Sequence, residues 1–299
     1  MACQHFYIFL LKKEDIYAKI EKRKFGGIPK MIKNIDLFEG KPDCSLSAYI
    51  HEDGTVRPCV IVCPGGSYRY HAPREAEPIA VFYYNAGFNA FILRYSVADK
   101  AANYAPLIEA ATTIKHIREN AESYFVDPQK IIICGFSAGG HLAGSAGILW
   151  NIPEVRDAIG VTDGRAPEGI NRPDGIILCY AVITAGEYTH RKSIYNIAGR
   201  EDYDENDVER FSLERHVNES TPPMFIWHTL GDKGVHIKNA LQLIDSYADN
   251  EIPFEAHIYP NGPHAMALCN KVTWDGKPEL LSEHNGTWKD LSVMWINEL

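Results

Sequence analysis

Six short runs of apolar residues recur along the chain, and longer segments that mix polar and apolar positions separate them. Each run is five to seven residues long and rich in β-branched side chains; the runs are 58–63, 89–95, 130–134, 175–181, 224–229 and 254–259. Runs of this length without polar alternation are typical of strands buried on both faces of a parallel sheet. The pattern therefore predicts six strands of one sheet.

The segments between these runs predict helices at 74–86, 104–124, 138–150, 236–250 and 288–299. Segment 104–124 shows the pattern most clearly, because its apolar residues recur every three or four positions and fall on one helical stripe. Strands that alternate with helices indicate an α/β fold with a mostly parallel central sheet flanked by helices. We expect residues 36–299 to form this domain.

Two segments interrupt the alternation. Residues 1–35 hold a highly charged stretch at 12–24 that ends at a Gly-Gly-Ile-Pro break, and we interpret them as an amino-terminal extension. Residues 182–223 are polar and acidic with several tyrosines. An irregular segment of this length inside a compact domain is usually functional. We predict that it is a cap or lid insertion over the carboxyl edge of the sheet.

The composition excludes several classes of protein. The chain has 299 residues and a formal net charge of −9, whereas nucleic-acid binding requires a basic face. No apolar run approaches the ~18 residues that a membrane span requires. The apolar start lacks a preceding basic residue and a small-residue cleavage site, so we expect no signal peptide. The seven cysteines lack paired spacing, and several fall in predicted strands, which indicates a reduced, cytoplasmic protein.

A G-x-S-x-G sequence lies between the third predicted strand and the helix that follows it. Gly135 and Gly139 flank Ser137 in this pentapeptide. A nucleophile elbow requires this order of strand, sharp turn and helix, with glycines where a side chain would collide with neighbouring backbone. A phosphate-binding turn is the alternative, but the chain has neither G-x-x-x-x-G-K-[ST] nor G-x-G-x-x-G after a strand. Ser137 is therefore the predicted nucleophile.

A serine nucleophile needs a histidine base that a carboxylate orients. Asp232 follows the strand predicted at 224–229, and His264 follows the strand predicted at 254–259, in the chain order that α/β-hydrolases use. Ligands meet open α/β sheets at these strand ends. The competing residues lie inside predicted strands or in the acidic insertion: His228, His257, Asp202, Asp204 and Asp207. We therefore predict Asp232 as the orienting acid and His264 as the base.

Backbone amides after the first predicted strand are suited to stabilise an oxyanion. The sequence Pro64-Gly-Gly-Ser-Tyr68 lies there, and we expect one donor from Gly66 or Ser67 and another from Ala138, directly after the nucleophile. A simple turn is the alternative interpretation of the glycine pair alone. Three further residues are candidates for contact with the substrate: Tyr68, Tyr180 and His141.

These motifs together resemble a known family. The shared landmarks are Pro64-Gly-Gly-Ser-Tyr68, Leu93-Arg-Tyr-Ser-Val97, Gly135-Phe-Ser-Ala-Gly-Gly-His-Leu-Ala143, Phe211-Ser-Leu-Glu-Arg-His-Val217, Thr221-Pro-Pro223, Trp227-His-Thr229 with Asp232, and Gly262-Pro-His264. They span about residues 40–270 and resemble the α/β-hydrolase serine esterases that act as acetylxylan or feruloyl esterases, relatives of the hormone-sensitive-lipase-type carboxylesterases. The resemblance implies an α/β-hydrolase fold with Ser137 as nucleophile, Asp232 as orienting acid and His264 as base. Pro64 stands where such esterases often have a histidine, which leaves the shape of this loop open.

We therefore expect a serine esterase that hydrolyses short acyl esters, acetyl before feruloyl, on a small-molecule or oligosaccharide substrate. The alternatives are a lipase-like esterase, a serine peptidase of the prolyl-oligopeptidase type and an inactive hydrolase-fold binding module. A peptidase of that type would need a propeller-sized amino-terminal region, which this sequence does not show. An inactive binding module is disfavoured because all three predicted catalytic residues are present. We expect no metal, because no H-E-x-x-H and no finger spacing occurs, and no other cofactor. No nucleic-acid or membrane partner is expected, and a homo-oligomer is left open.

Overall fold

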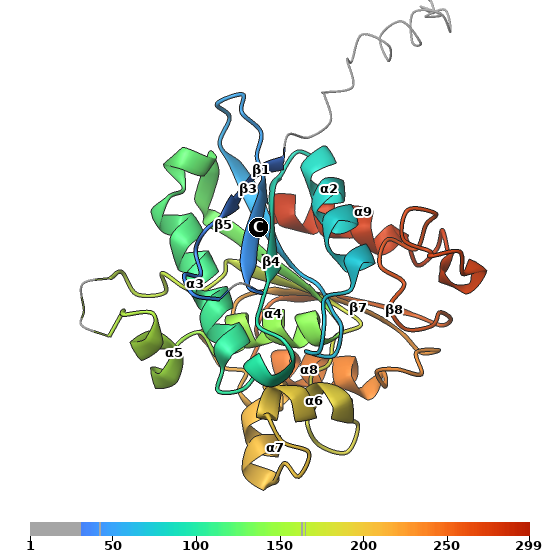
Figure 1. The fold of residues 1–299 in the computed structure, drawn as a ribbon. Coiled ribbons are helices and arrows are strands. Elements are labelled where there is room, and N and C mark those ends of the chain that lie inside the picture. Colours follow the sequence, from blue (N-terminus) through green and yellow to red (C-terminus); the bar gives the residue numbers. More distant parts are fainter. Residues whose placement is uncertain (1–30, 42, 163, 165) are drawn as a thin grey trace, which may run out of the picture. The chain divides into compact units, whose positions relative to one another are not determined.

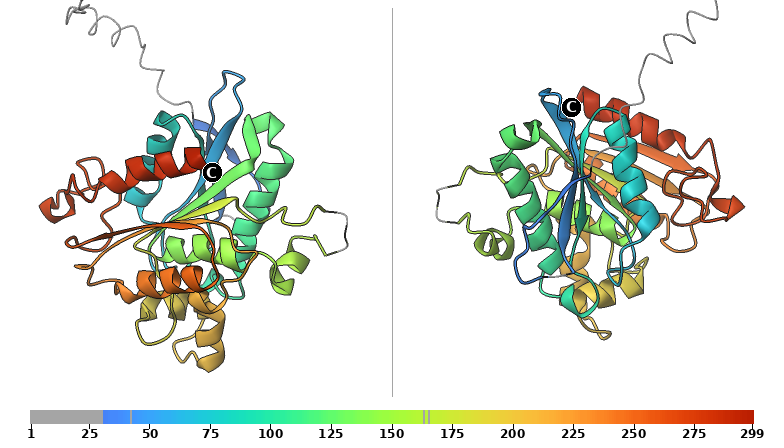
Figure 2. Two further views of the ribbon diagram at one scale, coloured as in Figure 1. Left: turned by 180° about the vertical axis from the view of Figure 1, so that it is seen from behind. Right: turned by 45° about the horizontal axis from the view of Figure 1, so that its top comes forward.

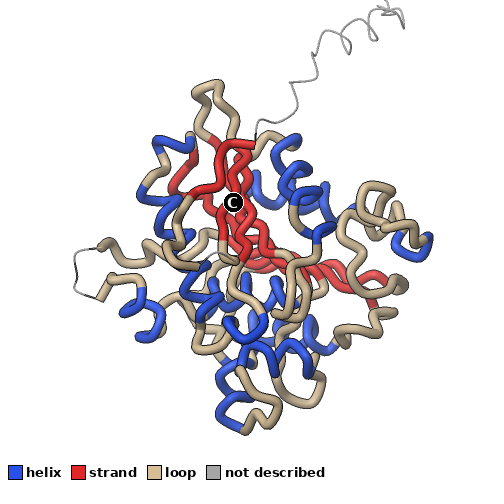
Figure 3. The backbone as a smooth tube through the Cα atoms, viewed as in Figure 1, coloured by secondary structure: helices blue, strands red, loops and turns tan. Residues whose placement is uncertain are grey.

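The computed structural model describes residues 31–41, 43–162, 164 and 166–299. The charged stretch at 12–24 and the rest of the segment up to residue 30, Cys3 included, lie outside the described residues. From residue 31 onward the chain folds around one twisted sheet that carries helices on both faces (Figure 1; Figure 3).

The sheet of the described residues has eight strands in the order β1-β2-β4-β3-β5-β6-β7-β8. The strands are β1 (Met31–Ile35), β2 (Ser45–Tyr49), β3 (Arg57–Cys63), β4 (Asn89–Arg94), β5 (Val126–Phe136), β6 (Gly175–Cys179), β7 (Met224–Thr229) and β8 (Phe254–Tyr259). Neighbouring strands from β4 across to β8 run parallel, whereas β2 pairs antiparallel with both β1 and β4. The six predicted strands are all present, and the expectation of a mostly parallel sheet is confirmed.

The pattern of apolar residues does not predict β1 and β2, which form one edge of the sheet. Both are short, and polar residues interrupt them: the Ser47 hydroxyl of β2 donates to Asn34 of β1 over 3.1 Å. This hydrogen bond can form only when the two strands lie side by side, so the sequence alone does not predict it. Residues 31–35 fall within the range predicted as an extension, yet they pair with β2 in the sheet.

Helices cover both faces of the sheet (Figure 2). They are η1 (Pro73–Glu75), α2 (Glu77–Asn85), η2 (Ala98–Lys100), α3 (Ala105–Glu119), η3 (Glu122–Tyr124), α4 (Ala138–Ile148), α5 (Pro153–Ala158), α6 (Arg191–Ala198), α7 (Glu205–Phe211), η4 (Leu213–Arg215), α8 (Lys238–Asp249), η5 (Pro278–Leu280) and α9 (Thr287–Glu298). α2 and α9 bury one face together with Val60 of β3, and α3, α4 and α8 bury the other together with Ile61. Successive residues of a strand thus enter opposite cores, which explains the uninterrupted apolar runs.

The segment 182–223 is partly helical rather than irregular throughout, because it contains α6, α7 and η4. α7 begins with a capping box in which Asp204 and Asp207 each accept a hydrogen bond from the other's backbone amide. Gly199 ends α6 in the left-handed conformation, at φ +73°. The ends of these short helices are defined by capping residues, and neither helix is long enough to show a clear apolar stripe. Apolar periodicity therefore predicts a loop for this segment. In Figure 1 these helices lie near α8 at the bottom of the view.

Candidate active site

Ser137 lies at the tip of a sharp turn between β5 and α4. Its backbone has φ +53° and ψ −116°, a strained conformation for a residue with a side chain. Two glycines allow the turn. A Cβ atom on Gly135 would lie 2.0 Å from the carbonyl oxygen of Gly139, and a Cβ atom on Gly139 would lie 2.1 Å from the carbonyl oxygen of Cys63. The chain therefore forms the strand, turn and helix that the G-x-S-x-G sequence predicts.

Asp232, His264 and Ser137 form one chain of hydrogen bonds. His264 Nδ1 lies 2.7 Å from Asp232 Oδ2, and His264 Nε2 lies 2.9 Å from Ser137 Oγ. Asp232 follows β7 and His264 follows β8, so the sheet brings together residues that are far apart in the sequence. The side chain of Asp232 is fully buried, whereas that of His264 is 24% exposed. The side chain of His264 is thus accessible and that of Asp232 is not.

The surroundings of Asp232 favour its ionised form. Its Oδ1 accepts hydrogen bonds from the backbone amides of Gly234, over 2.7 Å, and Val235, over 2.9 Å. Burial alone would raise the pKa of Asp232, but the hydrogen bond and charge of His264 and the Val235 amide outweigh it and hold that pKa below its ordinary value. An ionised Asp232 accepts the Nδ1–H of His264, which leaves Nε2 as the acceptor for the Ser137 hydroxyl.

The competing histidines and acids take part in other contacts. His228 is fully buried, and its Nε2 lies 3.0 Å from the carbonyl oxygen of Val235 and 3.5 Å from Asp232 Oδ2. Burial lowers the pKa of His228, so it is a neutral neighbour of the acid. Three of the other competitors have partners of their own: His257 pairs with Glu255, while Asp204 and Asp207 both pair with Arg200. The fourth, Asp202, is exposed in the segment between α6 and α7.

Residues 64–70, here called the Gly-Gly loop, follow β3 and lie against Ser137. Gly66, Ser67 and Tyr68 all have positive φ, at +131°, +58° and +56°. Four carbonyl groups of the loop are held in place: Pro64 by the Tyr95 hydroxyl, Gly65 by the Ala72 amide, Ser67 by the side chain of Asn196 and Tyr68 by the Ala98 amide. The loop is therefore fixed through its acceptors.

Fewer backbone amides than backbone carbonyls of the Gly-Gly loop form hydrogen bonds. Within the described part of the chain, the backbone amides of Gly66 and Ser67 have no acceptor, and neither has that of Ala138 at the start of α4. A Cβ atom on Gly65 would lie 3.0 Å from the Cβ of Ser137, so the loop lies next to Ser137. Backbone amides without an acceptor are suited to bind an oxyanion.

The three residues expected to contact the substrate are all buried. Tyr68 is 0% exposed, and its hydroxyl lies 2.8 Å from Nδ1 of His141. The other ring nitrogen of His141 donates to the carbonyl oxygen of Phe211 over 3.0 Å, and burial lowers the pKa of His141 to about 4, so the ring is neutral. Tyr180 is 1% exposed and packs edge-on against His264, with ring centres 5.1 Å apart. The structure thus places all three side chains inside the protein beside the site, and their contact with a substrate stays a prediction.

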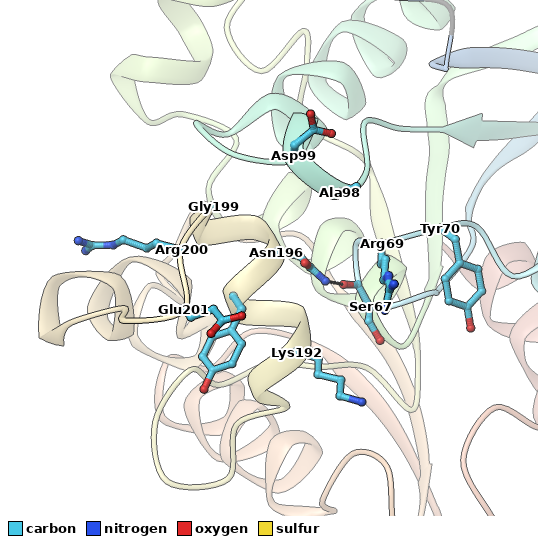
Figure 4. Close-up of a pocket in the computed structure, with 11 residues that line it drawn as sticks. Ser67, Arg69, Tyr70, Ala98, Asp99, Lys192, Asn196, Gly199, Arg200 and Glu201 are labelled. Carbon is cyan, nitrogen blue, oxygen red and sulfur yellow. Dashed lines mark hydrogen bonds between the residues drawn. The ribbon is translucent and has the colours of Figure 1, made fainter.

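A cavity of about 600 Å³ adjoins the Gly-Gly loop (Figure 4). Ser67 belongs to its lining, and Asn196 of α6 donates to the Ser67 carbonyl oxygen over 2.7 Å. Five charged side chains belong to the lining: Arg69, Asp99, Lys192, Arg200 and Glu201. The lining does not include Ser137, Asp232 or His264, so the cavity lies beside these hydrogen-bonded residues and does not enclose them.

Reasoning from the sequence misses two residues that shape this site. Glu75 is buried and accepts a hydrogen bond from the Gly65 amide over 2.9 Å. Asn196 lies in α6, in the segment predicted to be a loop. Neither belongs to a recognisable motif, because each acts through a partner that is distant in the sequence.

Other kinds of site find little support in the described residues. No group of three or more His, Cys, Asp or Glu side chains is placed to hold a metal ion in that part of the chain. The cysteines it contains are all buried and unbridged. Among the helices described, none is long and apolar enough to cross a membrane.

Comparison with families of known proteins gives a match over most of the chain. A family model described as BD-FAE matches residues 48–247. Endo-1,4-beta-xylanase B of Butyrivibrio fibrisolvens is 36% identical over 240 residues, and the acetylxylan esterase of Xylanibacter ruminicola is 25% identical over 234 residues. These matches cover 78% and 77% of this chain but 36% and 44% of the two relatives, so the chain spans less than half the length of either.

Solved structures are similar along nearly their whole length. The crystal structure of an acetyl ester-xyloside bifunctional hydrolase from Caldicellulosiruptor lactoaceticus superposes with a TM-score of 0.77 at 31% identity, covering 91% of this chain and 98% of that one. The fold is therefore that of the α/β-hydrolases.

Proposed function

The chain belongs to the BD-FAE family, and from that premise we propose that it is a serine carboxylic ester hydrolase with Ser137 as nucleophile, His264 as base and Asp232 as orienting acid. One observation carries the proposal: the unbroken hydrogen-bonded chain from Asp232 through His264 to Ser137. Esterases among the relatives and similar structures support it.

The first half-reaction acylates the enzyme. His264 Nε2 takes the proton of Ser137 as Oγ bonds to the ester carbonyl carbon, and the carbonyl electron pair moves to its oxygen. Asp232 stabilises the imidazolium that forms. The amides of Gly66 or Ser67 and of Ala138 donate to the oxyanion, and each such donor lowers the barrier by about 3–4 kcal/mol. The C–O bond then breaks, and the alcohol leaves with the proton from His264.

The second half-reaction releases the acid. His264 removes a proton from a water molecule as its oxygen attacks the acyl carbon, and the same amides stabilise the second oxyanion. Collapse of this intermediate breaks the bond to Oγ, which takes the proton back from His264. The carboxylic acid leaves, and the resting hydrogen bonds are restored.

We propose acetyl esters on carbohydrate as the preferred substrates. The name of one relative is acetylxylan esterase, and that of a similar structure is acetyl ester-xyloside hydrolase. The polar cavity beside Ser67 supports the proposal, because charged and amide side chains such as Arg69 and Asn196 bind hydroxyl groups rather than alkyl chains. A long acyl chain would need a continuous apolar wall. We infer that residues 182–223, which supply Lys192 and Asn196 to this cavity, act as the cap that selects the substrate.

The proposal is tested by hydrolysis rates on nitrophenyl acetate, butyrate, octanoate and ferulate and on acetylated xylo-oligosaccharides. We expect Ser137→Ala to abolish hydrolysis of every ester, and the acetyl ester to exceed the octanoyl ester in kcat/KM. Ser145→Ala, on the same helix, is the matched control: its buried hydroxyl donates to the His141 carbonyl oxygen, and its loss should leave kcat unchanged. An active Ser137→Ala variant would contradict the mechanism, and a kcat/KM that rises from acetate to octanoate would contradict the substrate class.

A further inference from the structure

Glu75 is a buried carboxylate that the mechanism above does not use. It ends the short helix η1, directly before α2, and is 1% exposed. An ionised group in such a place is unfavourable unless every lone pair has a donor. Its partners therefore indicate what the carboxylate does.

One oxygen of Glu75 holds the Gly-Gly loop. The amide of Gly65 donates to Oε2 over 2.9 Å. A Cβ atom on Gly65 would lie 2.6 Å from that oxygen and 3.0 Å from the Cβ of Ser137, so Glu75 and Ser137 both lie close to the same glycine. The carboxylate thus fixes the residue that precedes the oxyanion donors Gly66 and Ser67.

The other oxygen of Glu75 holds Tyr180, behind the base. The Tyr180 hydroxyl donates to Oε1 over 2.7 Å and accepts a hydrogen bond from the Ala267 amide over 3.0 Å. The ring of Tyr180 packs edge-on against His264, with ring centres 5.1 Å apart. The backbone of Tyr180 has φ +38°, a strained value that these contacts maintain. Glu75 is therefore linked to His264 through one side chain.

The contacts of Glu75 fit its charged form. Both partners donate to it, so each oxygen acts as an acceptor, whereas a protonated carboxyl would need an acceptor of its own. Burial raises the pKa of Glu75, and the Tyr180 hydrogen bond, the charge of His264 and the Gly65 amide oppose that rise. The protein thus keeps a buried charge beside the site at a cost in stability, as is common for functional groups.

We propose that Glu75 is a positioning residue, which fixes the Gly-Gly loop and Tyr180 and whose negative charge favours the protonated imidazole of His264 during acyl transfer. The inference rests on the proposed function. The charged or titratable groups that interact with His264 are Asp232 after β7, His228 on β7, His190 before α6 and Glu75 on η1. Arg74 also faces Glu75, and it pairs with Asp275.

The Glu75→Gln substitution removes the negative charge of the side chain but keeps its size and its hydrogen-bonding positions. The amide oxygen of glutamine can still accept from Gly65, and its NH₂ group can donate to the Tyr180 oxygen, so the loop keeps its anchor. We expect kcat for nitrophenyl acetate to fall about tenfold or more while KM stays within threefold, because the charge acts on the transition state rather than on substrate binding. The acidic limb of the kcat/KM–pH profile should move to lower pH by about half a unit, because the imidazolium loses a neighbouring anion.

Glu109→Gln is the matched control. Glu109 is also 1% exposed, and its carboxylate accepts from the Ser96 amide over 2.7 Å and from the Ser96 hydroxyl over 2.6 Å. The same substitution there removes an equally buried carboxylate that makes no contact with Gly65 or Tyr180. We expect kcat and the pH profile of this variant to match the wild type.

Ser137→Ala in the same assay distinguishes the two levels of the proposal. If Ser137→Ala is inert and Glu75→Gln keeps wild-type kcat and an unmoved acidic limb, the role of Glu75 is overturned and the proposed function stands. If Ser137→Ala is active, the proposed function itself fails. Should Glu75→Gln not fold, Glu75→Asp decides, because it keeps the charge but reaches less far by one methylene. A reduced kcat with an unmoved acidic limb is then expected, and wild-type kcat would overturn the positioning role.

Discussion

The turn around Ser137 and the polar cavity beside Ser67 lie next to each other but are built in opposite ways. The turn is buried, and its glycines leave no room even for a methyl group, since added Cβ atoms would lie 2.0–2.1 Å from backbone oxygens. The cavity is lined by charged side chains, of which Lys192 and Arg69 are exposed. In the proposed function, the chemistry therefore depends on rigid backbone geometry, whereas the choice of substrate depends on side chains that can be exchanged without disturbing the fold.

The largest effect should come from the hydrogen-bonded chain itself. We expect His264→Ala to lower kcat by about 10⁴-fold, as much as Ser137→Ala, and Asp232→Asn to lower it somewhat less, because the three residues act as a unit. Steady-state kinetics on nitrophenyl acetate measure this. A His264→Ala variant that keeps a tenth of the wild-type kcat would show that the rigid region is not where the chemistry occurs.

A smaller but still large effect is expected for Gly66→Ala in the Gly-Gly loop. Gly66 has φ +131°, and an added Cβ atom would lie 2.0 Å from the Tyr70 carbonyl oxygen, so the loop must move. We expect kcat to fall by about 10²–10³-fold, the usual loss for a displaced oxyanion donor. Gly87→Ala is the matched control, because its φ of +101° is also unfavourable but nothing lies within 4 Å of the added atom. Equal losses of kcat in the two variants would refute a specific role for the loop.

These two regions also differ in how far the sequence predicts them. The strand–turn–helix around Ser137 and the strand ends that carry Asp232 and His264 follow from apolar runs and local glycines, and the structure brings the three side chains together. Their catalytic roles stay predictions. Glu75 could not be identified from the sequence, because the role that we propose for it depends on contacts with Gly65 and Tyr180, which are 10 and 105 positions away.

The same reason explains the other omissions. β1 and β2 depend on polar pairs across the sheet edge, and α6 and α7 depend on caps and on packing beyond their own short length. The sequence predicts substrate contact for Tyr68, Tyr180 and His141, but it does not predict their burial, which depends on the fold. Local patterns thus predict the elements, while the partners of polar side chains require the structure.

In the cavity, by contrast, single changes should have modest effects that depend on the substrate. We expect Lys192→Ala to lower kcat/KM for acetylated xylo-oligosaccharides about three- to tenfold, the size of one lost hydrogen bond, and to leave nitrophenyl acetate unaffected. Lys277→Ala, at an exposed position outside the cavity lining, is the control. Equal effects on both substrates would show that the cavity does not determine substrate specificity.

The smallest effect concerns stability and pH. The pKa of Glu75 is raised in the folded chain, so its contribution to stability is fully present below its unfolded pKa and is lost as pH rises through its folded pKa. Glu75→Gln removes this dependence. The Tm of the variant minus that of the wild type should therefore become more positive between pH 4 and pH 8, by about 2–4 °C for each kcal/mol involved. Thermal melts across that range measure it, and a constant difference would mean that folding does not raise the pKa of Glu75.

The central claim is that Ser137 forms a covalent acyl intermediate. The most direct measurement is to react the protein with a fluorophosphonate, which attaches to activated serines, and to locate the adduct by peptide mass spectrometry. We predict one adduct per chain on the peptide that contains Ser137, none in Ser137→Ala, and full labelling of Ser145→Ala. An adduct on another residue, or none in a folded wild-type protein that hydrolyses nitrophenyl acetate, would contradict the account.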